Sequence, residues 1–293
     1  MSGSGATLGD AAASAVEFTR EAARRLWGVQ TLCAFGLALV FISLRGRVSP
    51  AEAVDLWRIG WVVAAVSAAP LWAGLYRLEL GGAACRGLGP AGVQFGMAEL
   101  RLIALGLAFL CAALLAWLPV VAVSAIVFVL FRGVGEVALG PLGEVQVSFL
   151  VASALWLTAL GGFAWACARM AFAPAATIGK RRLVLREAWA LGRGRVATVL
   201  AAWILAQAPA MLTLALLALV NQMELQDPVW GARSRWPVVD AAAGGLVLGL
   251  VVAFVQVPLT VGVLGRLYRA RRDRIRLQSA PRMHALGPEL LTG

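Results

Sequence analysis

Apolar residues along the chain gather into six long runs, and shorter polar connections separate them. Each run reaches roughly the 20 residues that an α-helix needs to cross the hydrocarbon core of a membrane. This pattern predicts an all-α fold, a polytopic transmembrane helical bundle with six spans. The predicted spans are 27–44, 59–76, 102–131, 149–168, 196–220 and 238–265.

The third run, 102–131, is too long for one straight span and contains Pro119 about halfway along. Two alternatives stay open: one long, tilted and kinked helix, or a span followed by an apolar segment buried at the outer surface. Two spans cut from this run would each be too short to cross a core of about 30 Å. We therefore expect six spans and not seven.

Two polar segments have the spacing of amphipathic helices that lie in the membrane interface on the cytoplasmic side. One is 180–193, where arginines oppose apolar residues, and the other is 10–26. Ser49, Pro50 and Glu52 have the form of a capping box, which predicts that a helix begins at Pro50. The expected apolar side of 10–26 consists of Ala12, Val16, Thr19, Ala23 and Leu26.

The composition supports a membrane protein, because 61% of the 293 residues are hydrophobic, 14% are charged and the mean hydropathy is +0.83. A soluble domain is about 45–50% apolar and about 25% charged, so these values exclude a soluble globular protein and a disordered chain. The charges are unbalanced, since 26 Lys and Arg residues stand against 15 Asp and Glu residues, a net charge of +11. Arginine carries this excess, because Lys180 is the one lysine in the chain.

The cations favour one side of the membrane. With the N-terminus in the cytoplasm, 20 of the 26 cations fall in cytoplasmic segments, as the positive-inside rule requires. This asymmetry predicts that both termini are cytoplasmic. It divides the chain into an amphipathic N-terminal segment 1–26, a six-helix transmembrane domain 27–265 and a basic cytoplasmic tail 266–293.

We find no catalytic or metal-binding signature in the sequence. Cys33, Cys85, Cys111 and Cys167 have no paired spacing, and the one histidine, His284, has no partner nearby. The sequence contains no nucleophile elbow, no P-loop and no pair of intramembrane aspartates. We therefore expect no enzyme activity, no metal and no cofactor.

Few polar groups lie within the spans. Gln207 and Gln256 are placed to hydrogen-bond across the fifth and sixth spans. Alternatively, they line a cavity together with Thr158 between proline-kinked helices, as in a transporter. Gly245 and Gly249 have the spacing that allows two helices to approach closely.

Arginines clustered on the predicted cytoplasmic face are the strongest chemical feature. Guanidinium groups fork to phosphate oxygens, and such clusters attract anionic headgroups at about 1 kcal/mol per residue. Alternatively, the arginines only set the topology. No nucleic-acid motif accompanies the charge, so nucleic acid is not an expected partner. The candidate residues for binding headgroups or a protein partner are Arg169, Arg181, Arg182, Arg186, Trp189, Arg193, Arg195, Arg269, Arg271 and Arg272.

Residues 165–205 read WACARMAFAPAATIGKRRLVLREAWALGRGRVATVLAAWIL, in which an arginine ends a span, Ala-Pro follows and a basic helix leads into the next span. This segment resembles the membrane domain that precedes the catalytic domain in some bacterial glycerophosphoryl diester phosphodiesterases, and related stand-alone six-span proteins. The resemblance implies a bacterial inner-membrane location. It implies the membrane module alone, because fewer than 30 residues follow the last span and a catalytic barrel needs about 250. The matching positions are Arg169, Pro174, Ala188, Trp189, Leu191, Arg193 and Gly194, with a weaker match at 262–269.

These features lead to the hypothesis of a non-enzymatic membrane scaffold or accessory module. Its arginine-rich cytoplasmic face would contact anionic lipid headgroups, a protein partner or a second copy in a homo-oligomer. The alternative hypothesis is a transporter-like protein with a neutral cavity between proline-kinked helices. A lipid-metabolising enzyme ranks third.

Overall fold

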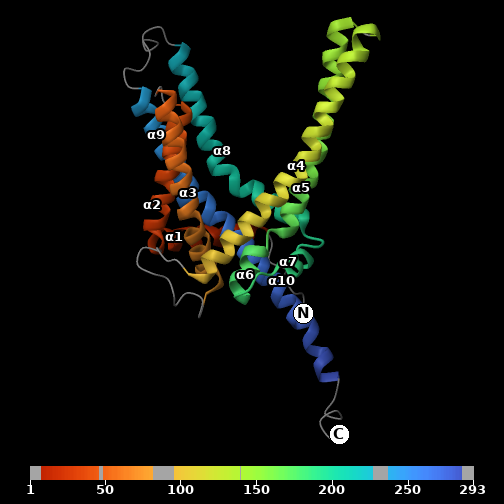
Figure 1. Cartoon of the computed structure of the whole chain (residues 1–293). Helices are drawn as coiled ribbons and strands as arrows, with labels where there is room; N and C mark the ends of the chain where they lie inside the picture. Colours follow the sequence, from red (N-terminus) through yellow and green to blue (C-terminus); the bar gives the residue numbers. More distant parts are fainter. Residues whose placement is uncertain (1–7, 46–48, 82–95, 139, 227–236, 286–293) are drawn as a thin grey trace.

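The structure is a computed structural model that describes residues 8–45, 49–81, 96–138, 140–226 and 237–285. Its described elements are all helices, which confirms the all-α prediction (Figure 1). Six segments are long and apolar enough to cross a membrane, as predicted, so the chain is a multi-pass membrane protein. The helices are α1 Leu8–Arg25, α2 Trp27–Arg45, α3 Pro50–Leu80, α4 Met97–Ala138, α5 Gly140–Met170, α6 Ala173–Lys180, α7 Leu185–Leu191, α8 Val196–Gln226, α9 Pro237–Leu250 and α10 Val257–Ala285, with the π-helical turn Val251–Gln256 between α9 and α10.

The overlong third run forms one continuous helix. α4 has 42 residues and passes through Pro119 without interruption, so the single long helix is the correct alternative. At a rise of 1.5 Å per residue, α4 is about 63 Å long, roughly twice the thickness of a hydrocarbon core. α4 packs along α5, and Figure 1 shows this pair tilted away from α8.

The capping box at the start of α3 is confirmed. The Ser49 side chain accepts a hydrogen bond from the Glu52 backbone N–H at 3.3 Å, and the Glu52 carboxylate accepts one from the Ser49 backbone N–H at 3.0 Å. These bonds satisfy two of the N–H groups that a helix start leaves without partners. Pro50 follows as the first helical residue, where its missing N–H costs nothing.

Small residues bring α2 very close to its two neighbours, α3 and α9. A Cβ atom on Gly249 of α9 would lie 2.4 Å from the carbonyl oxygen of Ala34 in α2. A Cβ atom on Gly245 would lie 3.0 Å from the Ala38 carbonyl oxygen. The predicted close approach at these two glycines is therefore confirmed. In a membrane, such contacts hold helices together by van der Waals packing, because lipid tails are as apolar as the helix surfaces.

A π-helical turn, Val251–Gln256, joins α9 to α10 immediately before Pro258. In the π-helical register a carbonyl bonds to the N–H five residues later, and Pro258 has no N–H to offer the carbonyl of Ala253. The fully buried side chain of Gln30 in α2 takes this place and donates to the Ala253 oxygen at 3.2 Å. The irregular backbone is thus satisfied by another helix, as the membrane interior requires.

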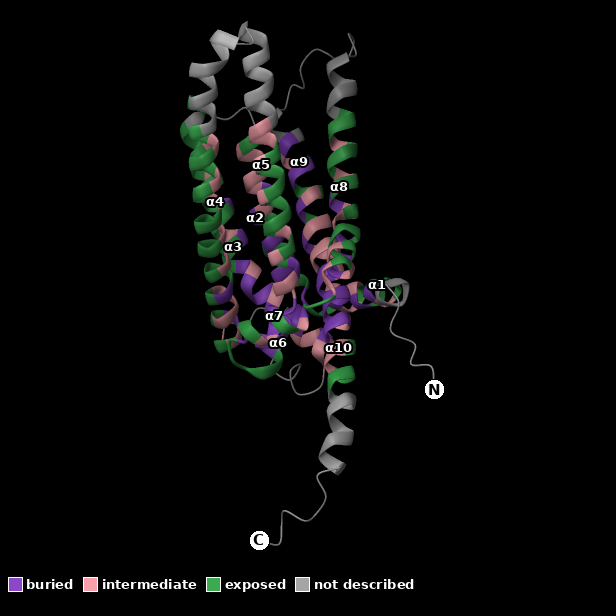
Figure 2. Cartoon of the chain, turned by 90° about the vertical axis from the view of Figure 1, so that its right-hand side faces the viewer, coloured by how far each residue is buried: buried purple, intermediate pink, exposed green. Residues whose placement is uncertain are grey.

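α1 lies across the long helices and packs on α10, as Figure 2 shows. Of the predicted apolar side, Leu26 is buried and Val16 is 50% exposed, so the face buried against the protein is rotated from the predicted one. Phe18 on the buried face lies against Gly262 of α10. The physical reason is that α1 packs on other helices of the protein. Small residues at this contact allow close packing, so they decide which face of α1 is buried. The orientation of the predicted side toward the membrane stays a prediction. The residues of the buried face are Ala15, Phe18, Ala22 and Leu26.

The core lies at the end of the bundle where α1, α2, α3, α6 and α10 meet. Its largest fully buried side chains include Tyr76 and Leu75 of α3, Phe172 before α6, and Val261 of α10. By contrast, most leucines of α4 are exposed, which suits a helix whose sides face lipid. The arginine-rich ends of the spans therefore sit on the best packed part of the molecule.

We predict that Gly249→Leu lowers the free energy of unfolding by about 3 kcal/mol, because the added side chain forces α2 and α9 apart. Thermal unfolding in mild detergent measures this effect. The matched control is Gly106→Leu in α4, since nothing lies within 4 Å of a Cβ atom at that glycine. Equal loss of stability in the two variants would contradict the packing described here.

Candidate functional site

The segment predicted as one amphipathic helix, 180–193, is interrupted. α6 ends at Lys180, Arg181 adopts a left-handed conformation with φ of 53°, and α7 begins only at Leu185. The prediction of a single helix was wrong because the left-handed backbone at Arg181 ends α6, and residues 181–184 belong to neither helix. Val184 and Ala188 of the predicted apolar side are nevertheless buried. The turn leaves the charged side chains of this connection pointing outward.

Glu187 neutralises two of the cations in the α6–α7 connection. Lys180 donates a hydrogen bond to one carboxylate oxygen of Glu187, and Arg182 donates to the other at 3.1 Å. The hydrogen bond from Lys180 is the main reason that the pKa of Glu187 lies below its ordinary value. The Glu187 carboxylate therefore stays charged at neutral pH, and its contribution to stability is lost as the pH falls through the lowered pKa.

Arg169 is held between two tryptophans. Its guanidinium carbon lies 5.1 Å from the ring centre of Trp165 and 4.7 Å from that of Trp189. The two rings meet edge to face at 5.5 Å. These cation–π contacts join the end of α5 to α7. Arg169 and Trp189, both candidates for headgroup binding, therefore position the α6–α7 connection.

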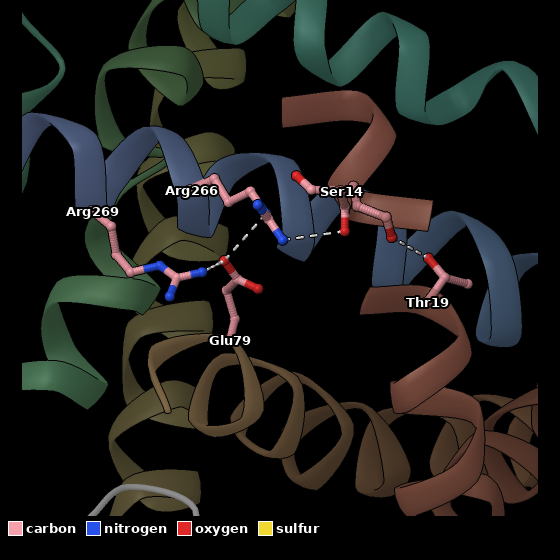
Figure 3. A network of polar contacts seen from close by, with 6 residues as sticks. Ser14, Thr19, Glu79, Arg266 and Arg269 are labelled. Atoms are coloured by element: carbon pink, nitrogen blue, oxygen red, sulfur yellow. Dashed lines mark hydrogen bonds and ion pairs between the residues drawn. The ribbon is translucent and has the colours of Figure 1, made fainter. Parts of the chain in front are cut away.

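A buried carboxylate, Glu79 at the end of α3, holds two arginines of α10 (Figure 3). The Glu79 side chain is 2% exposed; Arg269 donates to its Oε1 atom, and the Arg266 Nε atom lies 4.0 Å from the same oxygen. Arg266 also donates to the backbone carbonyl of Ser14 in α1 at 3.3 Å. Glu79 thereby ties α3 to α10, and Arg266 ties α10 to α1.

A second buried carboxylate, Glu99 near the start of α4, pairs with Arg77 of α3. The two side chains meet at 2.8 Å, with Glu99 0% and Arg77 12% exposed. Sequence reasoning missed the role of Glu79 and gave Glu99 no partner. In the sequence, each acid lies within two residues of an arginine near the end of a span. A sequence alone does not show which residue of another helix will pair with such an acid.

In the connection from α6 to α8, which includes α7, three candidate arginines are exposed and, among the described residues, have no acidic partner: Arg181, Arg186 and Arg193. Arg195, at the start of α8, is half-buried and likewise forms no ion pair within the described residues. On α10, Arg272 bonds to its neighbour Asp273 at 3.3 Å. We call Arg181, Arg186 and Arg193 the open arginines.

The two glutamines are confirmed as a link between helices. Gln256 of the π-helical turn donates a hydrogen bond to Gln207 of α8. Thr158 is exposed on α5, and its hydroxyl donates to the carbonyl of Ala154 in the same helix at 2.8 Å. The structure thus joins Gln207 to Gln256, while the hydroxyl of Thr158 bonds within its own helix.

A cavity of about 550 Å³ lies near the arginine-rich ends of the spans, between the α4–α5 pair and the rest of the bundle. Gln207, Gln256 and Thr158 are not among its lining residues, and their cavity role stays a prediction. Its walls are apolar apart from Tyr76 and Thr260. The cavity is lined by Trp72, Tyr76, Phe109, Leu160, Phe163, Ala164, Cys167, Ala168, Met170, Ala171, Pro174, Val199, Leu200, Trp203, Thr260 and Leu264.

The fold and this face define a multi-pass, all-α membrane protein with an arginine-rich end and an apolar cavity beside it. No family model, no curated protein and no solved structure matches the chain. The resemblance to the membrane domain of the phosphodiesterases therefore stays a prediction. Within the described part of the chain, no three His, Cys, Asp or Glu side chains gather in a way that could hold a metal ion.

We predict that Glu99→Gln destabilises the folded protein by about 3 kcal/mol, because it removes the buried negative charge that pairs with Arg77 at 2.8 Å. Arg77→Gln should lower the free energy of unfolding further, since it removes the cation that pairs with the fully buried carboxylate of Glu99. The double variant should recover part of the loss, and thermal unfolding of all three measures the coupling. Glu187→Gln is the matched control, with little change expected for an exposed acid. Additive losses in the double variant would contradict a direct pair.

Proposed function

We propose that this chain is a non-enzymatic module of the bacterial inner membrane whose arginine-rich cytoplasmic face binds anionic lipid headgroups. The observation that carries the proposal is the presence of the three open arginines on a connection that is itself fixed in place. Guanidinium groups bind phosphate through paired N–H donors and remain charged at any physiological pH. The competing hypothesis is that an acidic protein partner or a second copy of the chain binds to the same arginines.

The rigidity of the connection supports binding over a role in topology alone. The stacking of Arg169 on Trp165 and Trp189 fixes α7 to α5, and the buried Val184 and Ala188 anchor its other side. An arginine that only sets topology does not need a fixed position, because the positive-inside effect depends on the number of charges in short loops. Arginines held in a fixed position lose less conformational entropy when a headgroup binds.

The transporter-like alternative draws support from one arrangement, the Gln207–Gln256 bond at the π-helical turn beside Pro258. Such turns are frequent at functional sites. The two amides are hydrogen-bonded to each other, however, and the apolar cavity lies elsewhere. This arrangement therefore favours a link between helices over a path for a polar solute.

We predict that neutralising the open arginines, in the variant R181Q/R186Q/R193Q, weakens binding of anionic lipid. Added dioleoyl phosphatidylglycerol should raise the thermal midpoint of the wild type more than dioleoyl phosphatidylcholine does, because a ligand stabilises the state that it binds. At about 1 kcal/mol per residue near the surface, the triple variant should lose most of this difference.

The matched control is Arg58→Gln in α3, an exposed arginine that pairs only loosely with Asp55 at 3.9 Å, far along the chain from the open arginines. It should respond to both lipids as the wild type does. An undiminished response to phosphatidylglycerol in the triple variant would refute the proposal. Loss of a co-purifying protein with an unchanged lipid response would favour the protein-partner alternative instead.

A further inference from the structure

The apolar cavity has a buried floor and a lipid-facing rim. Its floor includes Tyr76 and Val199, which are 0% and 2% exposed. Its rim includes Leu160 and Phe163 of α5 and Trp203 of α8, all exposed. Because the rim residues belong to two helices that cross the membrane, the cavity opens sideways between α5 and α8, toward lipid.

The depth of the cavity corresponds to one leaflet. Its wall on α5 extends from Leu160 to Met170, about 15 Å at the rise of an α-helix, which is close to half of a roughly 30 Å hydrocarbon core. The lower end of this wall lies beside Arg169, at the arginine-rich end of the span. The cavity therefore covers the inner half of the membrane and not its full width.

The side chains that line the cavity favour a hydrocarbon chain over a polar solute. Apart from two residues the walls are aliphatic, aromatic or sulfur-containing side chains, which offer almost no partners to a polar solute. The hydroxyl of Thr260 is already bonded to the Gln256 carbonyl at 2.8 Å. A volume of about 550 Å³ falls within the range of pockets that hold one ligand of moderate size. One acyl chain fits this description better than a whole two-chain phospholipid.

A candidate cation for the headgroup of such a lipid, Arg195, lies one helical turn from a residue of the cavity floor. The N–H of Val199, on the cavity floor, donates to the carbonyl of Arg195 at 2.9 Å, so Arg195 lies one helical turn further toward the inner end. Arg195 immediately precedes α8, whose 31 residues direct the positive end of the helix dipole to the same place. A half-buried arginine without an ion pair among the described residues complements a negative charge there.

We propose that the cavity between α5 and α8 binds one acyl chain of a membrane phospholipid, with its anionic headgroup at Arg195. This site uses different residues from the open arginines and goes beyond the function proposed for them. It would retain a single lipid on each chain, in contrast to the exchangeable lipids that surround the exposed leucines of α4.

The experiment uses the full chain purified in mild detergent with equal amounts of dioleoyl phosphatidylglycerol and dioleoyl phosphatidylcholine. Native mass spectrometry counts the lipids that each chain retains. We expect one retained lipid in the wild type, mostly phosphatidylglycerol. Ala164→Trp and Leu200→Trp, which fill the cavity from opposite walls, should each lower the lipid-bound fraction at least tenfold.

Matched controls separate the cavity from other lipid contacts. Gly162→Trp adds the same side chain to α5 at an exposed position where nothing lies within 4 Å of a Cβ atom, and it should retain lipid as the wild type does. Arg195→Gln should keep a lipid but lose roughly fivefold in its preference for phosphatidylglycerol. The triple variant of the open arginines should retain the cavity lipid, so the two proposals fail separately.

Retention of lipid by both tryptophan variants at the wild-type level would overturn the proposal. So would equal losses in Gly162→Trp, because the lipid would then sit on the outer surface. A wild-type chain that retains no lipid but forms a dimer broken by Ala164→Trp would show that a second copy fills the cavity instead.

Discussion

Two buried carboxylates at one end of the bundle, Glu79 and Glu99, impose the constraint on which the rest of the structure depends. A charged carboxylate removed from water is tolerated only beside a cation with good geometry. Glu99 therefore requires Arg77, and Glu79 requires Arg269 with Arg266 nearby. Since the partners lie on different helices, satisfying these charges fixes α4, α10 and, through Arg266, α1 around the end of α3.

This pairing divides the arginines into two groups. Those that neutralise buried acids hold helices together, while the open arginines remain available on a connection fixed by the Arg169–tryptophan stack. The same pairing shapes the cavity, because its floor residue Tyr76 directly precedes Arg77, and Leu264 lies two residues before Arg266. The proposed headgroup binding and the proposed acyl-chain binding thus both rest on the arrangement that the buried carboxylates enforce.

Features that depend on local sequence could be predicted. The number of spans follows from hydropathy, the capping box from four consecutive residues, and the close approach at Gly249 from residue size. The Gln207–Gln256 bond was predictable because few other polar groups lie within those spans. The buried face of α1, the break at Arg181 and the partners of the two acids depend on which helices become neighbours. Hydrophobic periodicity carries no information about that choice.

An experimental structure of the chain in a lipid disc that contains phosphatidylglycerol would test the buried pairs and both proposed lipid contacts together. We expect a hydrocarbon chain between α5 and α8, a phosphate beside Arg195 or the open arginines, and Glu79 and Glu99 still paired with their own arginines. A cavity closed by protein side chains, together with phosphate bound to Arg266 and Arg269 in place of Glu79, would contradict this expectation.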